Sequence, residues 1–217
     1  MTLEDVPEMQ SIALLPNAPS LLNLGSLSPK ETALTRLPRT EPSLGSTGRP
    51  DLFTVTRRLK SMVNILTGDL FESKAQTLVN AVNCVGVMGK GVALEFKKRF
   101  PEMFADYEQR CRRHEVRLGQ PYLCKRRSPP LILNFPTKDH WRATSNLEDI
   151  IAGLEHLLAH YESWGIQSLA VPALGCGHGQ LDWRVVGPTL ARAFSRLGIP
   201  VELYAPLGTP QTDLQPL

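Results

Sequence analysis

The pattern of hydrophobic and polar positions changes at about residue 62. From there on, short apolar runs that suit strands alternate with segments whose apolar positions recur at helical spacing. This alternation is typical of α/β layering, in which helices cover the strands of a central sheet. The expected strands are residues 63–66, 78–82, 131–135, 168–171 and 201–204.

Helices are expected between these strands. Helical spacing predicts a helix ending near Phe100 and a second helix with Pro101 as its first residue. Ser145 and Glu148 have the spacing of a capping box, and Asp182 can cap the last helix. The apolar positions of these four helices are, in chain order, Val92, Phe96 and Phe100; Met103, Phe104, Tyr107 and Cys111; Leu147, Ile150, Ile151, Leu154, Leu157, Leu158 and Tyr161; and Val185, Val186, Leu190, Phe194 and Leu197.

The first sixty-one residues have a different composition. They hold seven of the eighteen prolines and a single aromatic residue, Phe53, so helices and strands have little room there. We expect a flexible extension over residues 1–61, a domain over 62–207 and a tail over 208–217. A short leucine-rich binding motif, or a gene start at Met62, are the alternatives for the extension.

Composition narrows the class of protein only moderately. With 42% hydrophobic and 21% charged residues the chain can bury a core, and a net charge of +3 does not select a partner. Its four cysteines include no C-x-x-C pair, so free thiols are expected rather than a zinc ribbon or a disulfide scaffold. No apolar run reaches the length of about 18 to 20 residues that spans a bilayer, and acids stand where a signal peptide needs positive charge. We expect a soluble cytoplasmic protein.

Two glycine-rich loops, residues 84–91 and 175–180, each follow a strand and precede a helix. Small residues there let backbone amides approach phosphates, and the next helix presents its positive end. The pair therefore predicts a diphosphate held from both sides, with plain turns as the alternative. The first loop is no Walker A motif, because the four-residue spacer is absent and Gly91 stands where Ser or Thr would bind magnesium.

Polar residues at strand ends are the next candidates. Asn80 and Asn83 end the strand before the first loop, where Asn amides can hydrogen-bond ribose hydroxyls. Asp69 can accept from an exocyclic amino group while Leu70 adds apolar contact. Ordinary turn chemistry is the alternative in each case.

Lys138 stands at a strand end, between helix amino ends and near His140 and Arg142. Such an ammonium can have a lowered pKa, which gives an amine able to attack an anomeric carbon or to protonate a departing base. A surface lysine in a loop is the alternative. Trp141 can stack on a nucleobase. The basic runs 97–99, 110–113 and 125–127 can track phosphates, unless they are simply solvated faces.

Four motifs in order carry a family resemblance: TGDLF (67–71), LVNAVN (78–83), GKGVA (89–93) and VPALGCG (171–177). Together they resemble the macrodomain family, whose fold binds ADP-ribose, over about residues 62–207. The implied fold is a three-layer α/β/α domain with a mixed central sheet. NFPTKDHWR (134–142) and GHGQLDW (177–183) are similar to the DarG branch, antitoxin enzymes that remove ADP-ribose from DNA bases.

The resemblance also implies site residues. Asp69 and Leu70 would lie by adenine, Asn83 by the distal ribose, and Lys138 corresponds to the catalytic lysine of the branch. The implied ligand-binding set further comprises Gly86, Met88, Gly89, Lys90 and Gly91 of the first loop, Gly175, Cys176, Gly177, His178, Gly179 and Gln180 of the second loop, and Thr137. His178 is expected to be structural or adjacent to the ligand rather than catalytic. Trp141 and Arg142 are the expected nucleic-acid contacts.

The chain departs from its implied relatives at two points. The related human terminal ADP-ribose glycohydrolase has an Asp in its second loop, where this chain has Gly179. Proteins of the DarG branch continue into a C-terminal domain that binds a toxin, whereas this chain ends at Leu217.

The expected activity is hydrolysis of the N-glycosidic bond between ADP-ribose and a DNA base, without a metal or organic cofactor. The expected partners are ADP-ribose, ADP-ribosylated single-stranded DNA and a DNA ADP-ribosyltransferase toxin, and the protein is expected to be a monomer. A non-catalytic reader of ADP-ribose, or a hydrolase of ADP-ribose esters on proteins or of O-acetyl-ADP-ribose, are the alternatives.

Overall fold

The structure is a computed structural model, and it describes residues 62–124 and 126–214. The expectation of a flexible extension over residues 1–61 lies outside the described residues. The strands are β1 (Val63–Leu66), β2 (Thr77–Asn83), β3 (Tyr122–Cys124), β4 (Leu131–Lys138), β5 (Leu169–Pro172) and β6 (Val201–Tyr204). The helices are α1 (Gly91–Arg99), α2 (Pro101–Arg112), α3 (Leu147–His160) and α4 (Trp183–Phe194), with short 3-10 helices η1 (Leu70–Glu72) and η2 (Gln211–Leu214).

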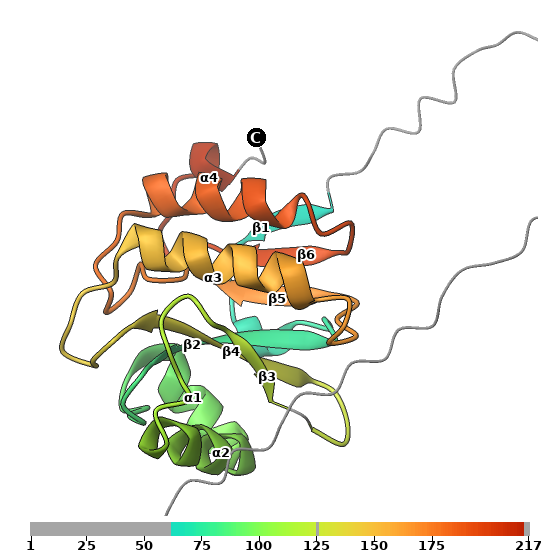
Figure 1. Ribbon diagram of the computed structural model, residues 1–217. Coiled ribbons are helices and arrows are strands. Elements are labelled where there is room, and N and C mark those ends of the chain that lie inside the picture. The colour runs from blue at the N-terminus through green and yellow to red at the C-terminus, as the bar shows by residue number, and fades with distance from the viewer. Residues whose placement is uncertain (1–61, 125, 215–217) are drawn as a thin grey trace, which may run out of the picture. The chain divides into compact units, whose positions relative to one another are not determined.

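The six strands form one mixed sheet in the order β1-β6-β5-β2-β4-β3 (Figure 1). All neighbours are parallel except β3 and β4, which are antiparallel. The central strands read as nearly continuous apolar runs because a parallel sheet is covered on both faces. The pattern of the sequence predicted every strand but β3, which is only three residues long.

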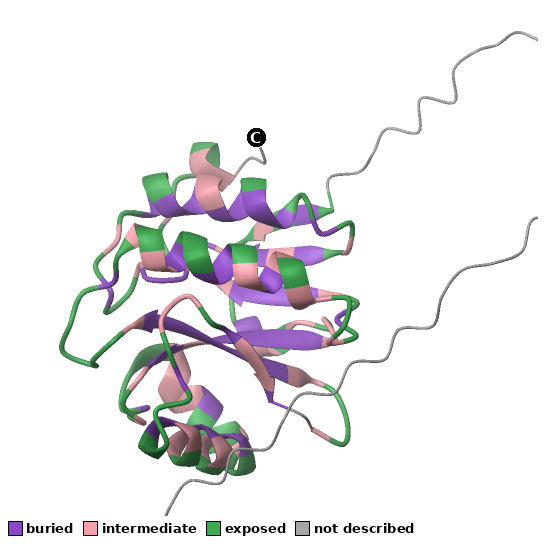
Figure 2. Cartoon of the chain, in the orientation of Figure 1, coloured by how far each residue is buried: buried purple, intermediate pink, exposed green. Residues whose placement is uncertain are grey.

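Alternate residues of the central strands β2, β4 and β5 enter separate hydrophobic clusters on the two faces of the sheet. In β4, Leu133 and Phe135 pack with α3 and α4, whereas Ile132 packs with the residues of α1 and α2. This follows from the two-residue period of a strand, which sends successive side chains to opposite faces. Figure 1 shows α3 and α4 on one face and α1 and α2 on the other, and Figure 2 shows the buried strands between them. The predicted three-layer α/β/α architecture is confirmed.

Two of the three predicted helix starts agree with the structure. Pro101 begins α2, and the Asp182 side chain accepts a hydrogen bond from the Arg184 amide at the start of α4, as predicted. The capping box was wrong: the N-cap of α3 is Asn146, and the buried Ser145 hydroxyl has no hydrogen-bond partner among the described residues. Ser145 instead lies under the second glycine loop and donates its backbone amide to Gly179.

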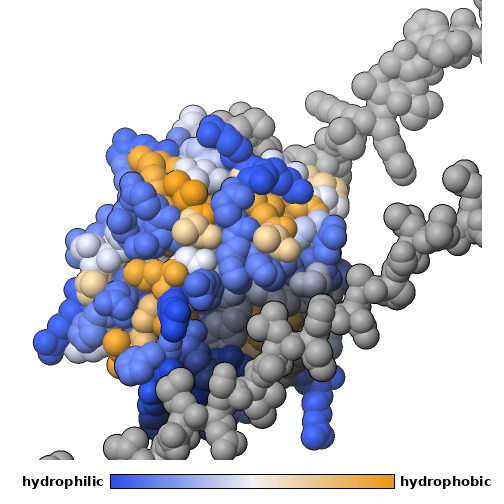
Figure 3. Space-filling model, in the orientation of Figure 1, coloured by the Kyte–Doolittle hydropathy of each residue, from blue (hydrophilic) through white to orange (hydrophobic). Residues whose placement is uncertain are grey.

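Two apolar positions assigned to helix stripes do not lie in the core, since Ile151 and Val185 expose 41% and 52% of their surface. Tyr161 and Leu197 lie beyond the last helical residues, yet Leu197 is a buried core residue and Tyr161 packs against the same cluster. The C-terminal segment continues along the domain past residue 207, since Leu214 packs against the core cluster of α3 and α4. In the part of the face that Figure 3 leaves uncovered, hydrophobic atoms form separate small patches among hydrophilic ones. No described helix is long and apolar enough to cross a bilayer.

Candidate functional site

A cleft of about 990 Å³ lies at the carboxyl ends of the central strands, within the size range of small-molecule sites. In an open α/β sheet, loops that leave neighbouring parallel strands meet at this edge. The first glycine loop (residues 84–91) leaves β2 and the second (residues 175–180) leaves β5, so both form its walls. The predicted site residues that line it are Asp69, Leu70, Asn83, Gly89, Lys90, Gly91, Thr137, Lys138, Trp141, Arg142, Gly175, Cys176, Gly177, His178 and Gly179.

Three predicted residues do not line the cleft. Met88 is 2% exposed because its side chain packs into the core beneath the first loop. Gly86 and Gln180 have φ angles of +81° and +64°, so they make the turns of their loops. Their places in the ligand-binding set stay predictions.

The first glycine loop is organised by Asn83, which is 6% exposed. Its Nδ2 donates to the Val87 carbonyl at 2.6 Å, and its Oδ1 accepts from the Val85 amide at 3.0 Å. The Tyr107 hydroxyl lies 3.0 Å from the same Oδ1, and burial raises the pKa of that phenol, so it stays a neutral donor. Asn83 therefore shapes the loop with the amide group that was predicted to meet the ribose.

The amino end of α1 faces the cleft. Lys90 and Gly91 both line it, and at the N-cap position Lys90 makes no side-chain capping hydrogen bond. Helix amino ends attract anions because their first amides are unpaired and the helix dipole is positive there. The amino end of α4 differs, since Asp182 already occupies it with its own carboxylate. Of the two helices that follow the glycine loops, α1 is therefore the one whose amino end is available to bind an anion.

The three glycines of the second loop differ in what surrounds them. A Cβ at Gly179 would collide with the Ser145 hydroxyl and the Gly175 carbonyl, and one at Gly175 would lie 2.7 Å from the Leu181 side chain. A Cβ at Gly177 would meet nothing within 4 Å. Packing therefore demands glycine at 179, and the φ angle of +76° favours it at 175, while Gly177 borders open space where a ligand can approach the backbone.

The two glycine loops approach each other at Gly91 and His178. Gly91 has a φ angle of +59°, and a Cβ built on it would lie 3.5 Å from the His178 ring. The two residues are 87 positions apart in the chain, which is why spacing alone could not predict their proximity. His178 lines the cleft, and its carbonyl accepts a hydrogen bond from Lys138 Nζ.

Lys138 ends β4 and is held by two backbone carbonyls. Its Nζ donates to Trp141 O at 3.1 Å and to His178 O at 3.0 Å. Among the described residues no carboxylate forms an ion pair with it, which agrees with the absence of an acid at Gly179. Partial burial lowers the pKa of the Lys138 ammonium. The geometry therefore fixes an amine at the cleft wall with one donor position still free.

Trp141 and Arg142 form the rim beside Lys138. The Arg142 guanidinium lies 4.4 Å from the centroid of the Trp141 ring, and the His140 ring lies 5.3 Å from it. His140 Nδ1 accepts from the Arg142 amide at 3.2 Å. The structure brings both predicted nucleic-acid contacts to the mouth of the cleft.

Asp69 lies at the other end of the cleft. Its Oδ1 accepts from the Phe71 amide at 2.9 Å, and its Oδ2 lies 3.9 Å from Arg99 Nη2. The Arg99 guanidinium stacks on the Phe71 ring, 4.3 Å from its centroid. Leu70 is 5% exposed, so little of it is open to a ligand.

Sequence reasoning missed several residues of this end, namely Phe71, Arg99, Tyr204, Ala205 and Pro206. For the last three a signal existed, because they end β6 or follow it at the edge where the other loops meet. Arg99 had been read as part of a phosphate-tracking run, whereas it lines the cleft.

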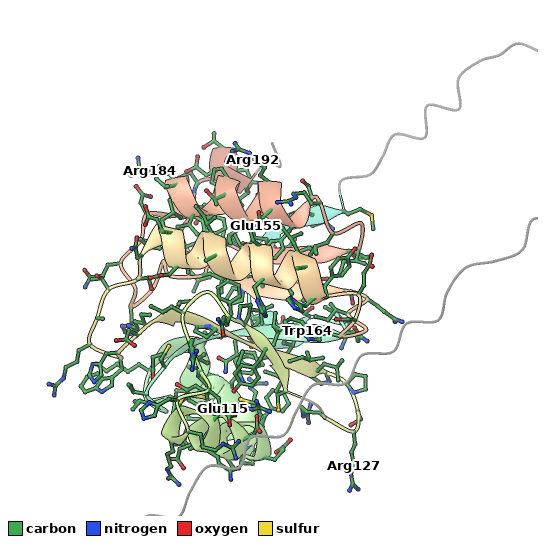
Figure 4. The ribbon with its side chains drawn as sticks, in the orientation of Figure 1. Glu115, Arg127, Glu155, Trp164, Arg184 and Arg192 are labelled. Atoms are coloured by element: carbon green, nitrogen blue, oxygen red, sulfur yellow. The ribbon has the colours of Figure 1, made fainter. Side chains whose placement is uncertain are left out.

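The other basic runs are largely neutralised by their own acids. Arg110, Arg112 and Arg113 pair with carboxylates of Asp106, Glu108 and Glu115, all within 2.9 Å. Arg126 pairs with Glu102, and Lys125 lies outside the described residues. Arg127 points away from the domain (Figure 4). These contacts favour the interpretation of runs 110–113 and 125–127 as solvated faces rather than phosphate-binding surfaces.

The cysteines are free, as predicted, and poorly suited to nucleophilic chemistry. Burial raises the pKa of Cys84 to about 12 and that of Cys176, in the second loop, to about 11. A thiol needs a lowered pKa to act as a thiolate near neutral pH. Among the described residues no group of three or more His, Cys, Asp or Glu side chains is placed to hold a metal ion.

Comparison with known proteins gives consistent matches. The Macro domain family model matches residues 79–190. The DNA ADP-ribosyl transferase-DNA ADP-ribosyl glycohydrolase fusion protein of Thermosipho africanus is 40% identical over 176 residues, which cover 73% of this chain and 45% of that protein.

Two solved structures are similar as well. Thermosipho africanus DarTG in complex with ADP-ribose matches with a TM-score of 0.68 and 42% identity, over 71% of this chain and 44% of that chain. The macrodomain of Mycobacterium tuberculosis DarG matches with a TM-score of 0.64 and 47% identity, over 67% of this chain and 99% of that chain. The chain spans less than half the length of the first curated relatives that it matches.

Proposed function

Because the chain belongs to the macrodomain family, we propose that its cleft binds ADP-ribose and that the protein removes ADP-ribose from modified DNA bases. Relatives at 40–47% identity carry the name DNA ADP-ribosyl glycohydrolase, alone or in a fusion, which supports this choice of substrate. The observation that carries the proposal is Lys138, an amine fixed at the cleft wall by two carbonyls. A protein that only reads ADP-ribose needs the loops but has no use for such an amine.

In the proposed complex the diphosphate lies between the two glycine loops. The amino end of α1, the open approach over Gly177 and Lys90, which forms no ion pair with a carboxylate of the described residues, support this position. The adenosine then extends toward Asp69 and the distal ribose toward Lys138. Both residues line the cleft, Asp69 after β1 and Lys138 at the end of β4, and three strands separate β1 from β4 in the sheet.

The proposed reaction breaks the bond between the anomeric carbon of the distal ribose and a base nitrogen. Water supplies the hydroxyl that ends on the anomeric carbon, and the departing base gains a proton. Lys138 contributes in one of two ways: as a free amine it attacks the anomeric carbon before water replaces it, or as an ammonium it donates its proton to the base. Its lowered pKa makes the free amine accessible, while the two carbonyl contacts favour the ammonium.

The test is single-turnover release of ADP-ribose from single-stranded oligonucleotides that carry ADP-ribose on a defined base. Wild-type protein is compared with Lys138→Ala and Lys138→Arg, and free ADP-ribose binding is measured for all three by calorimetry. Release by wild type and loss of release by both variants, with binding intact, is the expected result. Binding without release from any modified base would assign the protein to the readers, and release from ADP-ribose esters alone would assign it to the ester hydrolases.

The names of the relatives also support a functional partner. A DNA ADP-ribosyltransferase is joined to the glycohydrolase in the Thermosipho africanus fusion protein. We propose that an enzyme of that class produces the substrate of this protein, with the modified single-stranded DNA passing from one to the other.

A further inference from the structure

The mouth of the cleft beside Lys138 leaves apolar surface in water. Trp141 exposes 43% of its surface and Val87 exposes 39%, and both line the cleft. The two segments are joined, since the Cys84 amide donates to the Asp139 carbonyl at 3.0 Å. Single exposed hydrophobic residues are ordinary, but two that line the same cleft as Lys138 suggest a surface kept open for a ligand.

The Trp141 ring is held in place rather than loose. The Arg142 guanidinium stacks on it at 4.4 Å, and the turn is closed by the Ala143 amide, which donates to the His140 carbonyl at 2.9 Å. Nucleobases stack on such indole and guanidinium planes, which offer a π-face and a positive charge to any base.

Arg142 differs from other arginines of the domain in its ion pairing. On α2, the arginines at 110, 112 and 113 pair with nearby carboxylates, whereas no described carboxylate forms an ion pair with Arg142. Its charge is therefore available to an anion outside the protein. A strand of DNA offers that anion at each step along its backbone.

We infer that Trp141 and Arg142 form the seat of the acceptor nucleotide: the modified base stacks on Trp141, and Arg142 contacts a phosphate that flanks it. This inference rests on the proposed function and names how the same site recognises its DNA. Because the Trp141 carbonyl holds the Lys138 ammonium at 3.1 Å, a base on the indole lies beside the group that engages its glycosidic bond. Free ADP-ribose has no base at that position, so its binding does not use the seat.

The experiment separates the two contacts with three ligands: an oligonucleotide with one ADP-ribosylated base, the corresponding ADP-ribosylated nucleoside, and ADP-ribose. Trp141→Ala removes the indole but keeps the backbone carbonyl that holds Lys138. It should lower kcat/KM about tenfold to a hundredfold for both the oligonucleotide and the nucleoside, as expected for loss of one stacked base. Trp141→Phe should recover most of that loss, and ADP-ribose affinity should change less than about twofold.

Arg142→Ala should lower kcat/KM for the oligonucleotide and leave the nucleoside unaffected, because the nucleoside has no flanking phosphate. The slope of log affinity against log salt should become less negative by about 0.7, the contribution of one single-strand phosphate contact. Arg184→Ala is the matched control: this arginine is 78% exposed and projects from the start of α4 (Figure 4), and its removal should change none of these values.

Equal losses for ADP-ribose and for the DNA substrates in Trp141→Ala would show a structural role and overturn the inference, as would unchanged kcat/KM in both variants. If wild-type protein released ADP-ribose from no modified base, the proposed function would fail by itself. The seat would then be judged by equilibrium binding: a preference of wild type for the modified oligonucleotide over ADP-ribose that disappears in Trp141→Ala supports it, and no preference refutes it.

Discussion

The two ends of the cleft differ in how their charges are compensated. At the Asp69 end, the carboxylate faces Arg99, which in turn stacks on Phe71. At the Lys138 end, neither Lys138 nor Arg142 forms an ion pair with any carboxylate of the described residues, and two backbone carbonyls hold the amine. An end whose charges are paired suits recognition of a neutral group such as a purine. An end whose cations lack ion pairs can bind anions and transfer protons. Binding and chemistry should therefore respond to different mutations.

The largest effect should come from the region that both ends share. Gly177→Glu would place a carboxylate where the diphosphate is expected, so ADP-ribose binding and turnover should both be lost. Calorimetry with ADP-ribose measures the first and single-turnover release the second. Gly177→Ala is the control, because a Cβ there meets nothing within 4 Å, and it should bind normally. Unchanged affinity in Gly177→Glu would mean that the loop does not hold the diphosphate.

Lys138→Ala should affect the chemical step at one end of the cleft without affecting ADP-ribose binding. Turnover should fall at least about a hundredfold, the lower range for a positioned acid, base or nucleophile, while ADP-ribose affinity changes little. Lys138→Arg should not restore activity, because a guanidinium stays protonated and is a poor nucleophile. Equal single-turnover rates for wild type and Lys138→Ala would exclude the lysine from the mechanism.

The pH dependence of the chemical step should show which form of Lys138 acts. Burial lowers the pKa of its ammonium, so the free amine gains population at a lower pH than for an ordinary lysine. The rate should rise by up to about tenfold per pH unit below that pKa if the amine attacks. It should fall above that pKa if the ammonium donates its proton. A rate that does not change with pH in the wild type would show that the protonation state of Lys138 does not affect the rate-limiting step.

A smaller effect is expected at the Asp69 end. Asp69→Asn keeps an oxygen that can accept from the Phe71 amide but removes the charge, and should weaken ADP-ribose binding about threefold to tenfold, within the range of an ordinary hydrogen bond. The chemical step, measured at saturating protein, should not change. Asp69→Ala also removes the cap of η1, so comparing the melting temperatures of the two variants separates lost structure from lost recognition. A fall in the chemical rate with intact binding would contradict the division of the cleft.

Local interactions account for what could be predicted from the pattern of residues. Pro101 at the start of α2, the Asp182 cap of α4 and five of the six strands each depend on a few neighbouring residues, and they were predicted correctly. Ser145 shows the limit of this reasoning. Its spacing to Glu148 suits a capping box, yet the second glycine loop lies against it and the helix begins one residue later.

The sequence by itself determined the order of strands and helices, the two glycine loops and the candidate amine, because these depend on periodicity, turn chemistry and motif spacing within short segments. Only the tertiary structure decided what surrounds them. Lys138 donates a hydrogen bond to the His178 carbonyl, 40 residues away in the chain. Arg99 belongs to a basic run but lines the cleft, and the Asn83 side-chain amide donates to a carbonyl of the first glycine loop. Such contacts join segments that are distant in the chain, and which of them form depends on how the whole sheet and its helices pack.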